Sequence, residues 1–262
     1  MSEQLQPQSE LLQYPRLFGL IGYPLSHSFS KKYFSQRFAA AGITDAYYEL
    51  FPIKSIHNLL ILKVLYPNLQ GLNVTIPYKQ TVIPLLDELD ESAQAVGAVN
   101  TIHIQKDRLI GYNTDTYGFE ISLRQFLSTH AAQPKKALVL GRGGAAKAVA
   151  FVLQKMGIRF QYVSRQKSPD GLHYDELTQL HIIENQLIIN TTPLGMQPHI
   201  DTFPNIPYHC INESHLLFDL VYNPEETPFL KKGAEQGAAT SNGLQMLYLQ
   251  AERAGAIWET FV

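Results

Sequence analysis

The chain has 262 residues, 45% of them hydrophobic, and a formal net charge of −2, which favours one large or two modest packed domains over a disordered protein. The chain has no block of basic residues, so nothing indicates nucleic-acid binding. No apolar run reaches the roughly 18 residues that a membrane helix needs. The single cysteine, Cys210, excludes internal disulfides and favours the cytoplasm. We predict no metal site. The polar residues 1–15 do not resemble a signal peptide, and we expect them to form a loosely ordered extension.

Strands and helices alternate from the start of the chain, a pattern typical of a mostly parallel α/β sheet. Apolar runs predict strands, and apolar stripes at helical spacing predict helices. The expected strands are 16–21, 47–51 and 71–76, with a hairpin of 101–105 and 109–111, and the expected helices are 28–41 and 55–65.

A second set of elements follows an amphipathic helix predicted at 116–128. A short, wholly apolar strand is expected at 137–140, as in a sheet covered on both faces, and further strands are expected at 159–163, 187–190 and 216–220. We therefore predict an α/β protein with two domains. Residues 1–114 and 243–262 would form a mostly parallel α/β domain, with the C-terminal helix packing back on it. Residues 115–242 would form a second α/β domain, with a hinge at 113–116. The glycine turn described next makes the second domain a Rossmann-type dinucleotide-binding domain and leaves the first as the substrate domain.

A glycine-rich turn lies between the strand 137–140 and a helix that ends at Gly157. It fits the pattern G-x-G-x-x-G/A, whose small residues permit a tight turn and a close approach of backbone to a pyrophosphate. A glycine turn that only caps the helix is the alternative. The candidate cofactor-binding residues are Gly141, Arg142, Gly143, Gly144 and Ala145.

The next strand ends at Ser164-Arg165, where an NAD site usually has an acidic residue for the ribose 2′-hydroxyl. A basic position is expected if the nucleotide carries a 2′-phosphate, which Arg165 could bind through charge-assisted hydrogen bonds. A solvated surface arginine is the alternative. We predict NADP as the cofactor, with Ser164 and Arg165 at its adenosine end.

Polar residues gather at the end of the strand 71–76, in Asn73-Val74-Thr75-Ile76-Pro77-Tyr78-Lys79. Buried polar groups cost free energy unless something binds them. Asn100 and Asp115 follow in similar settings, and a lysine beside an aspartate forms an acid–base pair. The carboxylate would favour the charged lysine and burial would favour the neutral one, so its charge state stays open.

Taken together, these motifs resemble the shikimate dehydrogenase family over nearly all of residues 17–262. The resemblance rests on the order and spacing of many short segments. They are SHSFS at 26–30, NVTIPYK at 73–79, VGAVNT at 96–101, YNTD at 112–115, GRGGAAKA at 141–148, NTTPLGM at 190–196, DLVY at 219–222 and GLQMLYLQA at 243–251.

The resemblance implies an NADP-linked, reversible conversion of 3-dehydroshikimate to shikimate, and it also implies the following roles. Lys79 would be the acid–base group, working with Asp115. The substrate carboxylate would meet Ser28, Ser30 and Tyr222. The ring hydroxyls would meet Asn100, Asp115, Thr75 and Gln250. Leu220, Gly243 and Met246 would line the nicotinamide, and Glu91 would lie at the cofactor edge.

Two departures from the family pattern concern the cofactor. Arg142 replaces a small residue in the glycine loop, where it could contact a phosphate or point outward, and Ser164 stands where asparagine is common. A quinate or quinate/shikimate dehydrogenase is the first alternative function. A non-catalytic NADP-binding module is the second, and the presence of Lys79, Asn100 and Asp115 disfavours it. We expect a monomer or a homodimer.

Overall fold

The computed structural model describes residues 8–25 and 29–259. The chain divides into two compact units, each with its own sheet. Unit 1 comprises Met1–Thr114 with Ala251–Val262, and unit 2 comprises Asp115–Gln250.

Unit 1 contains a six-stranded sheet in the order β2-β1-β3-β5-β6-β4. The pairs β1–β2, β1–β3 and β4–β6 are parallel, whereas β5 pairs antiparallel with both β3 and β6. This agrees with the expected mostly parallel sheet that includes one hairpin. Its elements are β1 (Arg16–Gly22), α1 (Phe29–Ala40), β2 (Ala46–Pro52), α2 (Asn58–Leu65), β3 (Leu69–Val74), β4 (Glu88–Leu89), α3 (Glu91–Val96), β5 (Thr101–Gln105) and β6 (Arg108–Tyr112).

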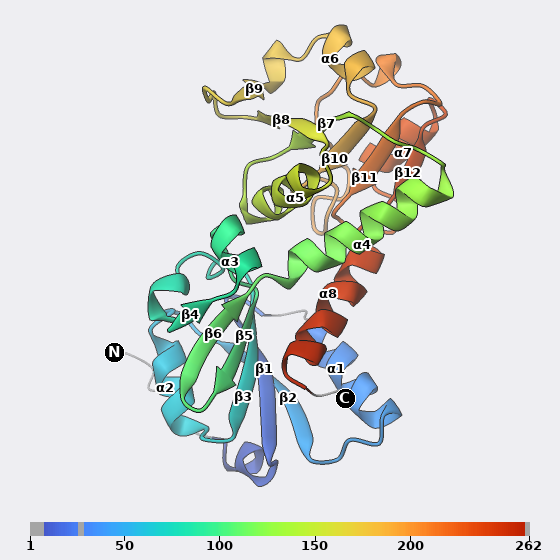
Figure 1. Ribbon diagram of the computed structural model, residues 1–262. Helices are drawn as coiled ribbons and strands as arrows, with labels where there is room; N and C mark the ends of the chain where they lie inside the picture. Colours follow the sequence, from blue (N-terminus) through green and yellow to red (C-terminus); the bar gives the residue numbers. More distant parts are fainter. Residues whose placement is uncertain (1–7, 26–28, 260–262) are drawn as a thin grey trace. The chain divides into compact units, whose positions relative to one another are not determined.

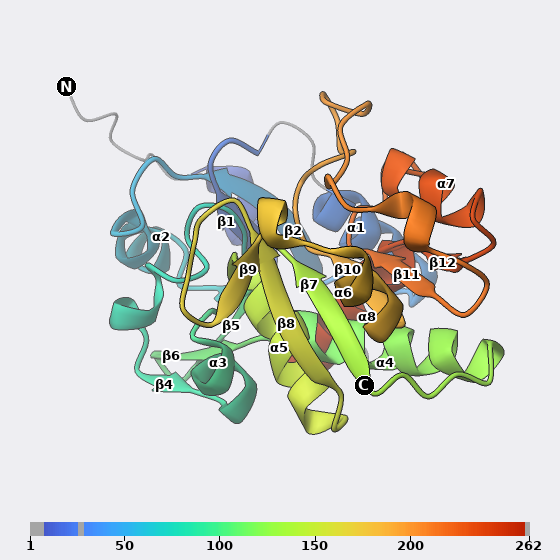
Figure 2. The same cartoon turned by 90° about the horizontal axis from the view of Figure 1, so that it is seen from above.

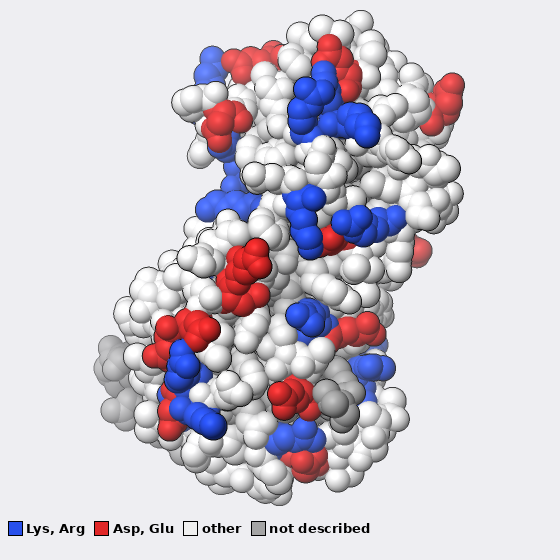
Figure 3. All heavy atoms as spheres, in the orientation of Figure 1, with Lys and Arg blue, Asp and Glu red and all other residues white. Residues whose placement is uncertain are grey.

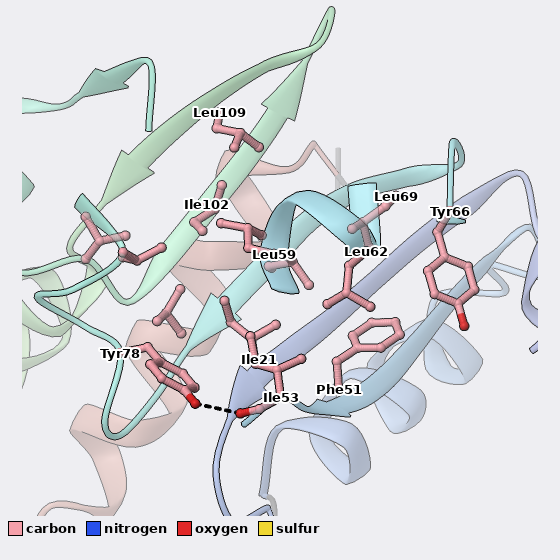
Figure 4. Packing of buried hydrophobic residues seen from close by; sticks show 14 of the residues in the cluster. Ile21, Phe51, Ile53, Leu59, Leu62, Tyr66, Leu69, Tyr78, Ile102 and Leu109 are labelled. Carbon is pink, nitrogen blue, oxygen red and sulfur yellow. Dashed lines mark hydrogen bonds between the residues drawn. The ribbon is translucent and has the colours of Figure 1, made fainter. Parts of the chain in front are cut away.

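Apolar clusters cover both faces of this sheet. Leu59 and Leu62 of α2 and Ala93 of α3 pack on one face, part of which is shown in Figure 4. Residues of α1 pack on the other face together with Trp258, whose indole N–H donates to the carbonyl of Ile102 at 2.9 Å. The sheet is therefore buried on both sides, which fixes the ends of its strands in place.

The N-terminal segment differs from the expected loose extension. Ser9–Gln13 form a 3₁₀ helix, and Leu11 is 2% exposed within the core. Tyr14 stacks on Tyr47 with ring centroids 4.7 Å apart, and the Asn68 amide donates to the carbonyls of Leu11 and Tyr14. The prediction was wrong for these residues because Leu11 and Tyr14 supply apolar anchors within a polar stretch. Residues 1–7 lie outside the described part.

Unit 2 contains a second six-stranded sheet, in the order β12-β11-β10-β7-β8-β9, which Figure 2 shows from above. All five strand pairs are parallel. With β7 as the first strand, this is the 3-2-1-4-5-6 order of a dinucleotide-binding sheet. Its elements are α4 (Thr114–Thr129), β7 (Lys136–Leu140), α5 (Gly144–Lys155), β8 (Arg159–Ser164), β9 (Gly171–His173), α6 (Gln179–Glu184), β10 (Leu187–Asn190), β11 (Leu216–Asp219), α7 (Pro228–Ala234), β12 (Ala239–Ser241) and α8 (Leu244–Ile257).

Helices cover both faces of the unit 2 sheet, as the wholly apolar strand at 137–140 predicts. Phe119 of α4 and Val149 of α5 pack on one face, and Ile182 of α6 and Phe229 of α7 pack on the other. The arrangement leaves the β7–α5 turn at the carboxyl end of the strands (Figure 1), where nucleotides bind in such folds.

Helix α8 contributes to both units. Met246 belongs to the core of unit 2, and Ala251 and Ala254 belong to the core of unit 1. The division therefore falls within the helix, before Ala251, and not at residue 243 as expected. Gly118 explains the difference, because a Cβ atom there would lie 2.6 Å from the Met246 carbonyl. This close packing on α4 keeps the first turn of α8 with unit 2.

Candidate functional site

In unit 1, the segment after β3 is held by hydrogen bonds at both ends. The Val74 N–H donates to the Asn100 carbonyl at 2.8 Å, and the Val99 N–H donates to the Lys79 carbonyl at 2.7 Å. Between them, the Tyr78 hydroxyl donates to the carbonyl of Ile53 at 2.6 Å (Figure 4). The predicted residues of 73–79 therefore lie alongside Val99 and Asn100, as the sequence motifs suggested.

Asn100 organises the other side of this strand end. Its side-chain oxygen accepts the Thr114 N–H at 2.7 Å, and its amide donates to the Thr114 hydroxyl at 3.0 Å. Asn100 is 3% exposed and Thr114 is 1% exposed. The asparagine thus fixes the start of α4, and Asp115 is the next residue along the chain. Charge-free hydrogen bonds in a dry setting hold such a geometry firmly.

A chain of buried hydrogen bonds extends from Asn100 to α1. The Asn73 amide donates to Thr101, and the Tyr48 hydroxyl donates to Asn73 at 2.7 Å. Burial raises the pKa of Tyr48, and a hydrogen bond with Ser30 offsets part of that effect. The structure therefore links Ser30, a predicted carboxylate ligand, to Asn100. Tyr48 was missed by the sequence analysis, because a tyrosine in a strand carries no signal that distinguishes it from a core residue.

The remaining predicted substrate residues lie elsewhere. Ser28 is outside the described residues. Tyr222 belongs to unit 2, is 36% exposed, and has a pKa that burial raises. Gln250 is the last residue of unit 2, and its side chain donates to the Leu247 carbonyl at 3.0 Å. Unit 1 thus brings together Thr75, Lys79 and Asn100, and hydrogen bonds through Tyr48 and Asn73 link Ser30 to them.

In unit 2, the glycine loop has the backbone that its sequence requires. Gly141 has φ +112°, and a Cβ atom there would lie 2.6 Å from the Thr191 hydroxyl. At Gly143 and Gly144 an added Cβ would meet open space, and no side chain caps the start of α5. The N-terminal N–H groups of a twelve-residue helix therefore face an uncrowded region. These features fit a pyrophosphate, which such helix ends bind.

The end of β8 is basic and exposed at Arg165. Ser164 is 9% exposed, and its hydroxyl donates to the Gln166 carbonyl at 2.7 Å, so this serine shapes the turn that carries the arginine. Arg142 does not point outward. Its guanidinium lies 4.9 Å from the centroid of the Tyr162 ring and bonds Asp170.

The predicted nicotinamide residues come together within unit 2. The Gly243 N–H donates to the Val221 carbonyl, and a Cβ atom at Gly243 would lie 2.1 Å from the Leu220 carbonyl oxygen. Met246 and Leu220 pack in the same apolar cluster. Close backbone contact is thus the physical reason for glycine at 243.

Asp219, which the sequence analysis did not single out as a site residue, supports the neighbouring loops. Its buried carboxylate accepts hydrogen bonds from the Thr227 hydroxyl, the Asn190 amide and the Val221 N–H. Asn190 in turn accepts two hydrogen bonds from Thr192. Burial raises the pKa of Asp219 to about 6, although the three donors oppose that shift. Hydrogen bonds from Asp219 through Asn190 therefore fix the start of the 190–196 loop.

Glu91 begins α3 in unit 1 and is exposed. Asp90 caps this helix by accepting the Ala93 N–H at 2.9 Å. Among residues 8–25 and 29–259, no group of three His, Cys, Asp or Glu side chains is arranged to hold a metal ion. None of the described helices is long and apolar enough to cross a membrane. On the face in Figure 3, basic and acidic side chains are interspersed.

Comparisons with known proteins find similar chains. A family model described as the shikimate dehydrogenase substrate binding domain matches residues 20–102. A shikimate dehydrogenase (NADP(+)) of Clostridium beijerinckii is 41% identical over 255 residues, covering 92% of this chain and 91% of the relative.

Solved structures are similar over both units. Shikimate 5-dehydrogenase of Thermus thermophilus, in complex with NADP(H) and shikimate, is 30% identical with a TM-score of 0.78, covering 93% of each chain. Quinate dehydrogenase of Corynebacterium glutamicum, in complex with NAD, is 29% identical with a TM-score of 0.83, again covering 93% of each chain. The two names differ in both substrate and cofactor.

Proposed function

This chain belongs to the shikimate dehydrogenase family, and we propose that it catalyses the reversible, NADP-dependent reduction of 3-dehydroshikimate to shikimate. The main observation in support of this proposal is the arrangement of residues after strand β3 in unit 1. There backbone hydrogen bonds hold Lys79 against the Val99–Asn100 segment, and Asn100 fixes the residue that precedes Asp115. Hydrogen bonds that fix polar groups in advance lower the ordering cost of binding a polar ring.

Lys79 is the proposed acid–base group. When bound, NADPH supplies a hydride to the substrate carbonyl carbon. The Lys79 ammonium then donates its proton to the oxygen that becomes the new hydroxyl, and in the reverse direction the amine takes this proton back. General acid–base catalysis of this kind contributes about 10²–10⁴-fold, and the ammonium also stabilises negative charge on the oxygen. In this proposal Asp115 is the catalytic partner of Lys79 and accepts a hydrogen bond from a ring hydroxyl.

The remaining polar groups bind the substrate. Thr75, Asn100 and Gln250 bind ring hydroxyls, and the Asn100 amide has two N–H donors, of which Thr114 takes one. Ser28, Ser30 and Tyr222 bind the carboxylate through neutral hydroxyls. Neutral donors make weaker hydrogen bonds than an arginine would, so moderate substrate affinity is expected.

Unit 2 binds the cofactor in this proposal. The N–H groups of Gly143, Gly144 and Ala145 at the start of α5 take the pyrophosphate, and Arg165 takes the 2′-phosphate. Leu220, Gly243 and Met246 line the nicotinamide. The resemblance to the family also assigns Glu91, a residue of unit 1, to the cofactor edge. The basic residue at the end of β8 supports NADP over NAD, because no acid follows Ser164 there to bind a 2′-hydroxyl.

The experiment is an absorbance assay of nicotinamide reduction with shikimate or quinate, each tested with NADP⁺ and NAD⁺. Shikimate with NADP⁺ is expected to have the highest kcat/KM of the four pairs. A higher value for quinate with NAD⁺ would instead make this chain a quinate dehydrogenase, like the similar Corynebacterium glutamicum structure. No turnover of any pair would favour a non-catalytic NADP-binding module.

The setting of the enzyme is part of the proposal. One cysteine in 262 residues, Cys210, fits a reducing compartment such as the cytoplasm. We propose that the protein acts there as a monomer or homodimer on small molecules. Size-exclusion chromatography with light scattering tests the assembly, and a higher oligomer would contradict it.

A further inference from the structure

Arg142, the second residue of the glycine loop, makes a compact set of contacts within unit 2. Its Nη2 donates to both carboxylate oxygens of Asp170, at 2.7 and 2.6 Å. Its guanidinium lies over the Tyr162 ring, at 4.9 Å from the centroid. A Cβ atom at Gly171 would lie 2.9 Å from Nη1, so the guanidinium also lies close to the start of β9. The loop after β7 is thus tied to the segment after β8.

These contacts leave little of the guanidinium for a ligand. Nη1 is buried and has no hydrogen-bond partner among the described residues, so a phosphate could not reach it without a rearrangement. Nη2 is already paired with Asp170. A phosphate that approaches Nη2 would therefore compete with the Asp170 carboxylate. The clearest route by which Arg142 can affect ligand binding runs through Asp170.

Asp170 is part of the short segment that carries the basic residues after β8. Arg165 and Lys167 precede it in the 165–170 connection. The Ser168 hydroxyl donates to the same carboxylate, and Ser168 bridges to Gly171, so the segment turns back tightly on itself. A carboxylate in the same six-residue segment as the proposed phosphate ligand would repel a phosphate unless its charge is balanced. Arg142 also keeps the pKa of Asp170 low, at about 2, so the carboxylate is ionised at neutral pH.

We propose that Arg142 is a positioning residue for cofactor specificity: by pairing with Asp170 it neutralises the one carboxylate of the 165–170 segment and holds that segment so that Arg165 can bind a 2′-phosphate. The inference rests on the proposed NADP site in unit 2. It assigns Arg142 a role distinct from a direct phosphate ligand. The sequence alone left open a phosphate contact or an outward orientation.

A double-mutant cycle with calorimetric binding tests this inference. The four proteins are the wild type, Arg142→Ala, Asp170→Asn and the double variant. The ligands are 2′,5′-ADP and 5′-AMP, which differ by the 2′-phosphate and lack the nicotinamide, and then NADP⁺ and NAD⁺. Arg142→Ala should weaken 2′,5′-ADP and NADP⁺ about tenfold, within the range for residues of one ion-pair network. It should change 5′-AMP and NAD⁺ by less than about twofold.

The decisive comparison is the effect of Arg142→Ala when Asp170 is already Asn. The proposal expects less than about twofold loss there, because no carboxylate remains to be balanced. The same tenfold loss in both backgrounds would show a direct contact and overturn the proposal. Equal weakening of 2′,5′-ADP and 5′-AMP would also overturn it, because the pair would then only hold the fold.

Controls separate these outcomes from unfolding and from a wrong cofactor. Lys136→Met breaks another ion pair of unit 2, with Glu184 at 2.6 Å, and should leave the preference for 2′,5′-ADP unchanged. Arg142→Lys keeps the charge and should retain most of that preference, and melting curves check that each variant folds. A wild type that binds 5′-AMP as tightly as 2′,5′-ADP would contradict the proposed cofactor itself, a result distinct from failure of the cycle.

Discussion

The two strand-end regions solve the problem of binding a polar ligand in different ways. In unit 1, buried side chains such as Asn73, Asn100 and Thr114 bond one another and fix the donors before a ligand arrives. In unit 2, Gly143 and Gly144 present backbone N–H groups in open space. A substrate with several hydroxyls requires side chains at defined positions, whereas a pyrophosphate requires positive N–H groups and room.

The difference implies that replacements in the two units should have separable effects. Side-chain removal in unit 1 should alter the chemical step or substrate binding. Replacements in unit 2 should alter cofactor affinity or the stability of that unit.

The largest effect is expected from Lys79→Ala. Loss of the proton donor should lower kcat by about 10²–10⁴-fold, with a much smaller change in KM for shikimate. Steady-state kinetics measures this, with Lys63→Ala as the control, because Lys63 pairs with Asp107 on the surface of unit 1. A Lys79→Ala enzyme with near-normal kcat would show that the acid–base group is another residue.

The next effect concerns the stability of unit 2 and its dependence on pH. Burial raises the pKa of Asp219 in the folded state to about 6, whereas the usual pKa of an aspartate is 3.8. The stability that the protonated Asp219 side chain contributes is therefore fully present below about pH 4 and is lost as pH rises through 6. Since one pKa unit corresponds to about 1.4 kcal/mol, the loss is about 3 kcal/mol.

Urea unfolding at pH 4 and pH 7 measures this contribution. Asp219→Asn cannot ionise, so its stability relative to the wild type should improve by about 3 kcal/mol between the two pH values. Asp201→Asn, at an exposed position, serves as the control and should show no such change. The same relative stability of Asp219→Asn at both pH values would refute the assignment.

A smaller effect is expected from Arg165→Ala. Hydrogen bonds to charged groups contribute about 1.5–3 kcal/mol, so NADP⁺ should bind roughly 10- to 100-fold more weakly. NAD⁺ should change by less than about twofold, since it lacks the 2′-phosphate. Arg159→Ala, at the exposed start of the same strand, is the matched control. Equal losses for both nucleotides would show that Arg165 does not bind the 2′-phosphate.

The smallest pair of effects separates two glycines of one loop. Gly141→Ala forces a Cβ into a positive-φ position next to Thr191 and should destabilise the fold by about 1–3 kcal/mol. Gly143→Ala meets open space and should leave stability within about 0.5 kcal/mol. It should still weaken both nucleotides by about tenfold, because the methyl group would occupy the path of the pyrophosphate. Unchanged nucleotide binding by Gly143→Ala would place the pyrophosphate elsewhere.

Much of the fold could be predicted because long apolar strands and glycine turns carry strong local signals. The strand Leu187–Asn190 has the expected bounds, and β7, β8 and β11 differ from theirs by one residue. Short elements such as β4, β9 and β12 were not predicted, since two or three residues show no periodicity. Strand β3 ends at Val74, before the expected 76, and Ile76 is 73% exposed. An apolar residue there does not signal burial.

The candidate site divides in the same way. Thr75, Lys79 and Asn100 were predicted from residue types at strand ends, and the structure places them along adjoining backbone segments. The sequence did not predict the roles of Tyr48 and Asp219 or the pairing of Arg142 with Asp170. Each depends on contacts between residues that are apart in the chain. Local sequence indicates where a polar residue lies along a strand or turn, but its hydrogen-bond partner becomes known only when the order of the strands in the sheet is known.

The most direct test of the two-region account is a crystal structure of the chain with shikimate and NADP⁺ bound. The account predicts that Lys79 Nζ and an Asp115 carboxylate oxygen lie within hydrogen-bond distance of the ring hydroxyl that is oxidised, with Arg165 on the 2′-phosphate. Shikimate bound away from Lys79 and Asn100, or a 2′-phosphate away from Arg165, would contradict it.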